Sequence, residues 1–248
     1  MAGEFMNAII LAAGLGTRFG TLTLKNHKAL LSIGGIPNIE RTLHYLRDAG
    51  VKDTAVVTGH MADRFDYLSN RYGCRLIHNP RFREWNNIYS MACASEYLDD
   101  TFVVDADVVL FENVFGPSTD SCYYTIVRRE RHSMEWLPCV NDLGYVSDIT
   151  VSNEAKPSLL GISYWSSRDC RIVRPLLKAR ACEPAMLSDP ARYWDDIPRA
   201  LLGQLRVRTI RVGPDSAIEM DTPDDYRRAC ALHELRSGAP YVSCEQAG

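Results

Sequence analysis

The chain has 248 residues, of which 46% are hydrophobic and 24% charged, and its formal net charge is −3. This length and composition fit one large α/β domain with a substantial core and exclude a disordered chain. The slightly acidic balance gives no basic footprint for nucleic acid, and no apolar run approaches the roughly 20 residues of a membrane helix. We therefore expect a globular protein with neither a nucleic-acid nor a membrane partner.

Residues 1–5 precede a second methionine, Met6, and resemble a remnant of an expression vector. We accordingly expect a domain over residues 6–235 and a tail over 236–248. The start of the chain lacks the features of a signal peptide, and the eight cysteines include no C-x-x-C pair. These features predict a cytoplasmic protein without disulfides or a zinc site, whose cysteines are mostly small buried hydrophobes.

The first half of the chain alternates predicted strands and helices. Residues 7–13 form an apolar run ended by Gly14, as expected for a strand buried on both faces of a parallel sheet. Further strands are predicted at 54–58, 75–77 and 101–104, and helices from Pro37, near Met61 and near Asn87. Such alternation predicts right-handed βαβ units and a mostly parallel sheet.

The second half differs, because its first three strands follow one another without helices between them. Strands are predicted at 122–127, 139–149, 159–165 and 207–212, and helices at 167–180, at 193–203 and from Pro223. We expect a single α/β domain with a Rossmann-like mixed sheet, helices on both faces and a small antiparallel lobe.

A glycine-containing loop follows the first strand. Gly14 and Gly16 would let the backbone fold closely around phosphates with its N–H groups pointing inward. Arg18 and a following lysine, Lys28 or its rival Lys25, add positive charge where a triphosphate needs it. The spacing matches neither the Rossmann nor the Walker motif. A strand-to-helix turn without a ligand is the alternative interpretation.

Two acidic positions are candidates for a magnesium site. Asp105 and Asp107 end a hydrophobic strand, at the edge where ligands bind in open α/β sheets, and only one of them is expected to enter the site. Asp221 comes much later, just before a helix that opens with Pro223. Magnesium prefers oxygen ligands and shares its shell with substrate phosphates. Capping of a loop and of a helix is the alternative role for these aspartates.

Residues 10–18, ILAAGLGTR, with Lys28 ten positions beyond Arg18, resemble the signature of the GT-A-like nucleotidyltransferases. The resemblance implies that the loop wraps a nucleoside triphosphate and that Arg18 and Lys28 are catalytic residues contacting its phosphates. It also implies metal ligation by Asp107 and Asp221, with Asp105 supporting the turn. Many members have proline before the lysine, whereas His27 stands here. The implied nucleotide-binding loop residues are Leu11, Ala12, Ala13, Gly14, Gly16 and Thr17.

Later segments, at 86–90, 105–110, 135–138, 161–165 and 193–198, resemble one branch, the bacterial LicC-type CTP:phosphocholine cytidylyltransferases, over residues 6–230. At the helix near Asn87, Asn86 is a candidate cap, while Asn87 and Ser90 are candidates to bind base or ribose, with capping alone as the alternative. The branch implies an acceptor pocket of aromatic and acidic residues for a quaternary ammonium.

The side chains present suit that acceptor chemistry. Trp136 and Tyr193 offer ring faces worth roughly 0.5–2 kcal/mol each to a cation, and Asp195 and Glu219 offer countercharge. We therefore expect a Mg²⁺-dependent enzyme, a monomer or homodimer, that transfers CMP from CTP to phosphocholine. Three alternatives stay open: 2-aminoethylphosphonate or phosphoethanolamine as acceptor, since methyl contacts discriminate by only about 1–3 kcal/mol; a sugar-1-phosphate nucleotidyltransferase; and a nucleotide-binding protein without turnover.

Overall fold

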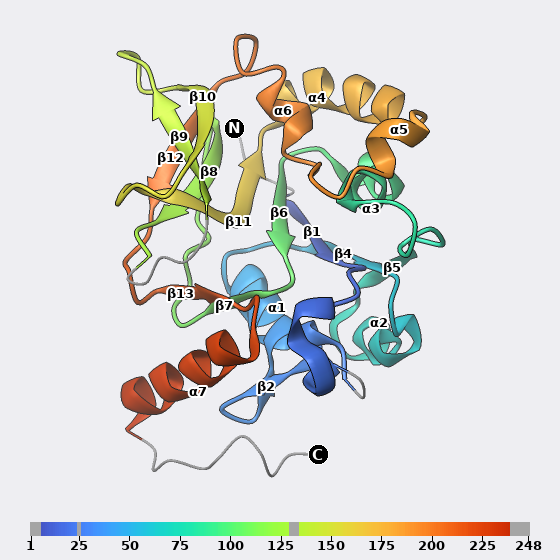
Figure 1. Ribbon diagram of the computed structural model, residues 1–248, viewed down its shortest axis with the longest axis vertical. Coiled ribbons are helices and arrows are strands. Elements are labelled where there is room, and N and C mark those ends of the chain that lie inside the picture. The colour runs from blue at the N-terminus through green and yellow to red at the C-terminus, as the bar shows by residue number, and fades with distance from the viewer. Residues whose placement is uncertain (1–5, 24–25, 129–133, 239–248) are drawn as a thin grey trace.

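The structure is a computed structural model that describes residues 6–23, 26–128 and 134–238 (Figure 1). The predicted remnant at 1–5, Lys25 and residues 239–248 of the predicted tail lie outside the described residues. The strands are β1 (Asn7–Ala12), β2 (Ser32–Ile33), β3 (Ile36–Pro37), β4 (Asp53–Thr58), β5 (Arg75–His78), β6 (Thr101–Asp105), β7 (Val108–Leu110), β8 (Ser121–Ile126), β9 (Glu135–Val140), β10 (Val146–Ser152), β11 (Ser158–Trp165), β12 (Val207–Arg211) and β13 (Ala217–Glu219). The helices are α1 (Asn38–Asp48), α2 (Tyr67–Tyr72), α3 (Asn87–Cys93), α4 (Ser167–Arg180), α5 (Pro184–Leu187), α6 (Asp196–Arg199) and α7 (Pro223–Ser237), with the 3-10 turns η1 (Thr17–Thr23), η2 (Lys28–Leu30), η3 (Ala62–Phe65) and η4 (Ser95–Tyr97).

The central sheet of the described chain has the order β12-β8-β11-β6-β1-β4-β5 (Figure 1). β1 pairs in parallel with β4 and β6, and β5 pairs in parallel with β4. β11 runs antiparallel between β6 and β8, while β12 is parallel to β8. The mixed, mostly parallel sheet predicted from the alternation of elements is confirmed.

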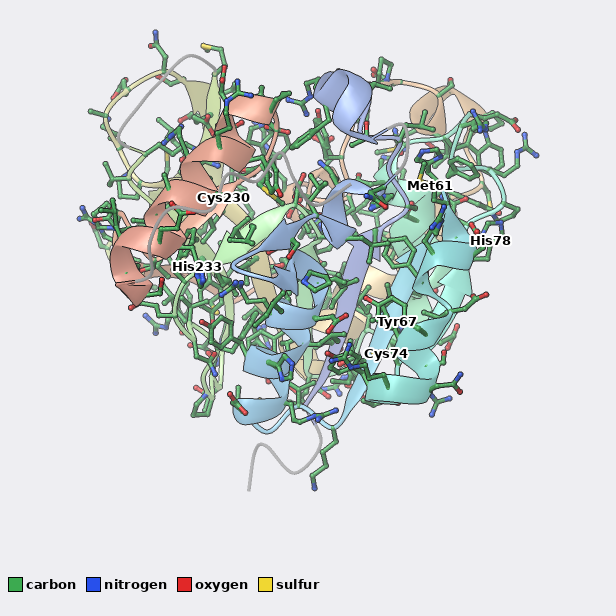
Figure 2. The ribbon with its side chains drawn as sticks, turned by 90° about the horizontal axis from the view of Figure 1, so that it is seen from below. Met61, Tyr67, Cys74, His78, Cys230 and His233 are labelled. Atoms are coloured by element: carbon green, nitrogen blue, oxygen red, sulfur yellow. The ribbon has the colours of Figure 1, made fainter. Side chains whose placement is uncertain are left out.

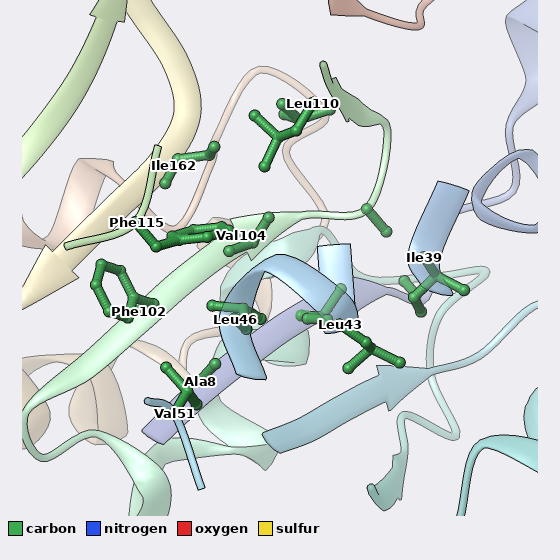
Figure 3. Packing of buried hydrophobic residues seen from close by; sticks show 14 of the residues in the cluster. Ala8, Ile39, Leu43, Leu46, Val51, Phe102, Val104, Leu110, Phe115 and Ile162 are labelled. Carbon is green, nitrogen blue, oxygen red and sulfur yellow. The ribbon is translucent and has the colours of Figure 1, made fainter. Parts of the chain in front are cut away.

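Helices cover both faces of this sheet, which explains the uninterrupted apolar run of β1. Because successive strand residues point to opposite faces, Ala8 and Ile10 pack on the α1 side, whereas Ile9 and Leu11 pack on the side of α3 and α4. Figure 3 shows the first of these layers, where Leu43 and Leu46 of α1 lie over the strands.

A third cluster joins the chain's last helix to its first loop. Phe19 of η1, which is 1% exposed, packs with Met220, Tyr226 and Ala229. Figure 2 shows α7, with Cys230 and His233, on the opposite side of the molecule from Tyr67 and Cys74 at α2. The two chain regions that carry Arg18 and Asp221 are therefore held together by apolar packing.

Two predicted elements were wrong in extent. The strand predicted at 139–149 is instead parts of β9 and β10, paired antiparallel around a turn in which the Asn141 side chain accepts from the N–H groups of Leu143 and Tyr145. The helix predicted at 193–203 is regular only over α6, since Pro198 and Gly203 restrict it to about one turn.

Within the described residues, no helix is both long and apolar enough to cross a membrane. The cysteines there are free thiols, and Cys74, Cys122, Cys170 and Cys230 are buried.

Candidate active site

A cleft of about 1570 Å³ lies at the carboxyl ends of β1 and β6. Its walls come from the glycine loop, the turn after β6, the β9 strand, the segment before α6 and the start of α7. This is the edge at which open α/β sheets bind ligands. Elements from both halves of the sequence therefore meet at one large concave site.

The glycine loop forms one wall of the cleft. Gly16 has a φ of 63°, a backbone conformation that residues other than glycine rarely adopt. Its carbonyl accepts hydrogen bonds from the Phe19 N–H at 3.0 Å and the Thr23 hydroxyl at 3.2 Å. Gly16 thus shapes the turn and is not itself among the described residues lining the cleft. The other predicted loop residues do line it: Leu11, Ala12, Ala13, Gly14 and Thr17.

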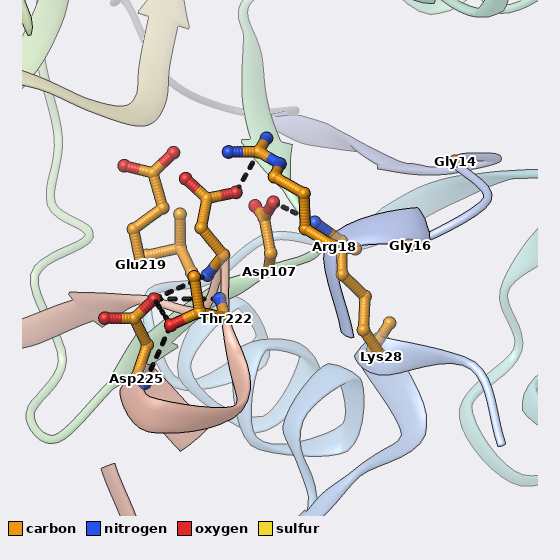
Figure 4. A network of polar contacts seen from close by, with 12 residues as sticks. Gly14, Gly16, Arg18, Lys28, Asp107, Glu219, Thr222 and Asp225 are labelled. Carbon is orange, nitrogen blue, oxygen red and sulfur yellow. Dashed lines mark hydrogen bonds and ion pairs between the residues drawn. The ribbon is translucent and has the colours of Figure 1, made fainter. Parts of the chain in front are cut away.

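Lys28 and Asp107 form an ion pair at the centre of the cleft (Figure 4). Burial lowers the pKa of Lys28, but the Asp107 carboxylate outweighs it, so the pKa of Lys28 is raised and the ammonium stays charged. The second oxygen of Asp107, Oδ1, is buried and has no hydrogen-bond partner among the described residues. A buried carboxylate oxygen left in this way is unfavourable, so Asp107 retains an open position for a positive ligand.

Asp221 lies beside this pair, held by a salt bridge of 2.9 Å from Arg18 Nη2 to its Oδ1. Burial and then the charge of Asp107 raise the pKa of Asp221, while Arg18 and Lys28 act in the opposite direction. Two carboxylates are thus close enough to repel each other. No group of three or more His, Cys, Asp and Glu side chains that could hold a metal occurs in the part of the chain described.

The backbone brings the two aspartates together. β13 pairs with β7, and the Met220 N–H donates to the Asp107 carbonyl at 2.9 Å. The α7 cap is a reciprocal capping box between Thr222 and Asp225. Because these two residues cap the helix, the alternative interpretation of Asp221 as the helix cap is wrong.

The expectation that only one of Asp105 and Asp107 enters the site was also wrong. Both line the cleft, Asp105 from the last position of β6 and Asp107 from the turn that follows it. Asp105 borders a small cavity of about 20 Å³ that it shares with Asp195, and burial and then Asp107 raise its pKa well above the usual value. The turn is held by Asn38 of α1, whose amide donates to the carbonyls of Ala106 at 3.1 Å and Val108 at 2.9 Å.

All four predicted acceptor residues line the cleft, and two of them contact each other. Trp136 of β9 and Tyr193 pack edge to face with ring centroids 6.1 Å apart, and Tyr193 is 46% exposed. Asp195 also lines the cleft, and burial and then Asp196 raise its pKa to about 7. The Arg199 guanidinium lies 5.4 Å from the Trp136 ring centroid, so part of that ring is already covered.

Glu219 also lines the cleft and is paired with Arg128, a residue that was not predicted from the sequence. Arg128 also donates to the Ser158 hydroxyl and the Leu159 carbonyl, and its Nε lies 3.6 Å from Glu135. Burial and then Asp107 raise the pKa of Glu219 even though Arg128 opposes the shift. The only sequence signal for Arg128 was a basic residue directly after a predicted strand.

Asn86, Asn87 and Ser90 line the cleft at the start of α3. Asn86 caps the helix by accepting from the Ile88 N–H, as predicted. Asn87 accepts from the Trp194 N–H at 2.8 Å, and buried Ser90 bonds to Asn79 at 2.9 Å. Asn87 therefore connects α3 to the segment that carries Tyr193 and Trp194.

The fold and the site define a class of protein. A glycine loop, a charged lysine and paired carboxylates at the carboxyl edge of an α/β sheet are the parts of a nucleotidyltransferase. Residues 8–115 match the family described as MobA-like NTP transferase domain. The protein is a nucleotidyltransferase.

Among its relatives is the choline-phosphate cytidylyltransferase of Haemophilus influenzae, 45% identical over 89% of this chain and 94% of that protein. The 2-aminoethylphosphonate cytidylyltransferase of Lancefieldella rimae is 32% identical over 88% of this chain and 89% of that protein. A solved structure of CTP:phosphocholine cytidylyltransferase from Streptococcus pneumoniae (LicC) superposes with a TM-score of 0.85 at 33% identity, covering 94% of this chain and 99% of that one. The chain belongs to the same cytidylyltransferase family as these relatives.

Proposed function

We propose that this protein transfers CMP from CTP to phosphocholine and releases CDP-choline and pyrophosphate. The observation that carries the proposal is the perpendicular Trp136–Tyr193 pair in a cleft that Asp195, Lys28 and two further aspartates also line. Aromatic faces and partly buried acids together suit a quaternary ammonium, which has no N–H to donate. The 45% identity to a choline-phosphate cytidylyltransferase supports the same acceptor.

The donor nucleotide is assigned to the glycine-loop end of the cleft. Arg18 and Lys28 would contact the phosphates, and the loop residues that line the cleft would offer backbone N–H groups. Asn87 and Ser90 are proposed to face the base or ribose, with their present partners holding them in orientation. The reaction then depends on positioning and charge stabilisation.

Asp107 and Asp221 would hold a divalent cation, for which we propose Mg²⁺. The unpartnered Oδ1 of Asp107 fits a positive ligand, and so do the burial and the repulsion by Asp107 that raise the pKa of Asp221. With only two protein carboxylates, the remaining ligands would be phosphate oxygens and water, as magnesium prefers. When bound, the cation would neutralise phosphate charge.

In the proposed reaction, a phosphate oxygen of the acceptor attacks the α-phosphorus of CTP. A new P–O bond forms, the bond from the α-phosphorus to the bridging oxygen breaks, and pyrophosphate leaves with that electron pair. Lys28, kept charged in the cleft, would stabilise the charge that builds up on the phosphoryl oxygens. No covalent enzyme intermediate is required.

A second candidate acceptor is 2-aminoethylphosphonate, favoured by the relative from Lancefieldella rimae. A pyrophosphate-release panel separates the two: CTP is paired with phosphocholine, phosphoethanolamine, 2-aminoethylphosphonate and sugar 1-phosphates, and phosphocholine is also paired with UTP and dTTP. We expect the highest kcat/KM for CTP with phosphocholine. A higher value for the phosphonate would replace phosphocholine as the acceptor, and preference for a sugar phosphate would remove both.

A cytoplasmic setting is proposed as well. The free thiols of Cys139 and Cys182 are exposed, as reducing compartments permit.

A further inference from the structure

His27 stands where many nucleotidyltransferases of this signature carry proline, and its ring contacts the glycine loop. The ring is 2% exposed and packs edge-on against Phe65, with centroids 5.0 Å apart. Its Nδ1 accepts from the Ala29 N–H at 3.1 Å, so that nitrogen carries no proton. The other nitrogen, Nε2, must then donate to the Gly14 carbonyl, which lies 3.0 Å away.

The neutral ring needed for this arrangement is the form that persists at physiological pH. Burial first, and then the charges of Lys28 and His60, lower the pKa of His27 to about 4, although the Gly14 bond and Asp107 act in the opposite direction. Proline offers no hydrogen-bond donor, so the link to Gly14 is specific to the histidine.

The carbonyl of Ala13, which precedes Gly14 in the loop, is also held by a hydrogen bond. The His60 N–H donates to the Ala13 carbonyl at 3.3 Å. In a planar trans peptide, the carbonyl and the following N–H point in opposite directions. Fixing the carbonyls of Ala13 and Gly14 therefore turns the N–H groups of Gly14 and Leu15 away from these partners, and both residues line the cleft.

We propose that His27 is a positioning residue that presets the glycine loop as a phosphate-binding nest, by anchoring the Gly14 carbonyl on the buried side. The inference rests on the proposed function in one respect: the phosphates in question are those of the donor nucleotide. The loop residues contact the ligand, whereas His27 acts through the loop and gives its N–H groups a fixed direction before the nucleotide arrives.

Two amide variants separate the two bonds of the ring. In His27→Asn, the side-chain carbonyl takes the place of Nδ1 and keeps the Ala29 contact, but the amide stops short of Gly14. In His27→Gln, the amide reaches the place of Nε2 and keeps the donor to Gly14, while the Ala29 contact is lost. Both substitutions remove the ring, so the lost packing is matched.

The experiment measures binding of CTP and of inorganic triphosphate by calorimetry without an acceptor, together with KM for each substrate and the melting temperature. We expect His27→Asn to weaken CTP and triphosphate binding about three- to tenfold, the loss of one hydrogen bond, without changing the acceptor KM. His27→Gln should stay within about twofold of wild type. This pattern has to hold even where both variants melt at the same lowered temperature.

Equal triphosphate affinity in wild type and His27→Asn would overturn the inference, and so would a loss in His27→Gln as large as that in His27→Asn. Should His27→Asn fail to fold, the His27→Gln affinity decides alone. Wild type that binds triphosphate but releases no pyrophosphate with any acceptor would overturn the proposed function and leave the positioning role of His27 intact.

Discussion

Among single residues, Asp107 and Asp221 should matter most for turnover. We expect Asp107→Asn and Asp221→Asn each to lower kcat by about 100-fold or more, because a neutral amide replaces the negative charge that would bind the cation. Circular dichroism should show an unchanged fold. Asp224→Asn is the matched control, since Asp224 is an exposed neighbour paired with Arg227. Full activity in either of the first two variants would remove that aspartate from the metal site.

Trp136 should act on the acceptor rather than on CTP. Trp136→Ala removes one aromatic face, worth roughly 0.5–2 kcal/mol, so the KM for phosphocholine should rise about two- to thirtyfold while the KM for CTP changes little. Trp85→Ala provides the comparison, because Trp85 also lines the cleft but packs against Tyr89 away from Tyr193. Equal effects on both KM values would place Trp136 outside the acceptor pocket.

Asp195 should make both the stability of the protein and its affinity for a cation depend on pH. Its pKa in the folded protein is about 7, against the ordinary 3.8, so between these values the folded protein keeps a proton that the unfolded chain has released. Stability from this group is therefore present below about pH 4 and is lost as pH rises to 7. Above pH 7 the carboxylate is charged and attracts a cation.

Inhibition by free choline measures this effect without interference from a titrating phosphate. We expect the inhibition constant to fall as pH rises through about 7, and Asp195→Asn to show a smaller change. Asp195→Asn should also melt at a higher temperature than wild type at pH 8, because the substitution removes a partly buried negative charge. A variant with an unaltered pH profile would show that Asp195 does not face the ammonium.

At the scale of elements, the capping box of α7 contributes to the stability of the protein and also to the position of Asp221 in the active site. Thr222→Ala removes one partner of the box, which should lower the free energy of unfolding by about 1 kcal/mol and the melting temperature by about 2–4 °C. Because Asp221 directly precedes the cap, kcat should fall as well. Ser166→Ala is the matched control: Ser166 caps α4 far along the chain, so its loss should lower the melting temperature and leave kcat unchanged.

Elements with strong local patterns could be predicted from sequence, and contacts between distant elements could not. The run from Asn7 and the periodicity of Ile39, Leu43 and Leu46 gave β1 and α1 to within a residue or two. The hairpin at Asn141 was predicted as one strand because the residues on either side of its turn show little alternation of hydrophobic and polar side chains. Arg128 went unnoticed because its importance comes from partners such as Glu219, which local periodicity does not reveal.

The same limit applied to the site. Gly14, Arg18, Lys28, Asp107 and Asp221 belong to recognisable motifs, and the structure brings them to one cleft, although their roles stay proposals. Asn38 looked like an ordinary helix start, yet it holds the turn that carries Asp107. Such supporting side chains act through backbone carbonyls of remote segments, for which no residue pattern exists.

At the scale of the whole molecule, ligand binding should stabilise the fold. CTP with Mg²⁺ at about 100 times its dissociation constant adds about 2.7 kcal/mol, which corresponds to a melting temperature higher by about 5–10 °C in a chain of this size. The rise should disappear with EDTA and be much smaller in Asp107→Asn. A shift of equal size without any divalent cation would argue against metal-assisted nucleotide binding.

The pairing of β7 with β13 has a consequence for how such enzymes diversify. The Asp107 and Asp221 segments are joined by main-chain hydrogen bonds, which depend little on side-chain identity. The chain between them, which carries Trp136, Tyr193 and Asp195, can thus exchange its side chains without separating the two aspartates. A lineage can in this way adopt a new acceptor while its reaction centre is inherited unaltered.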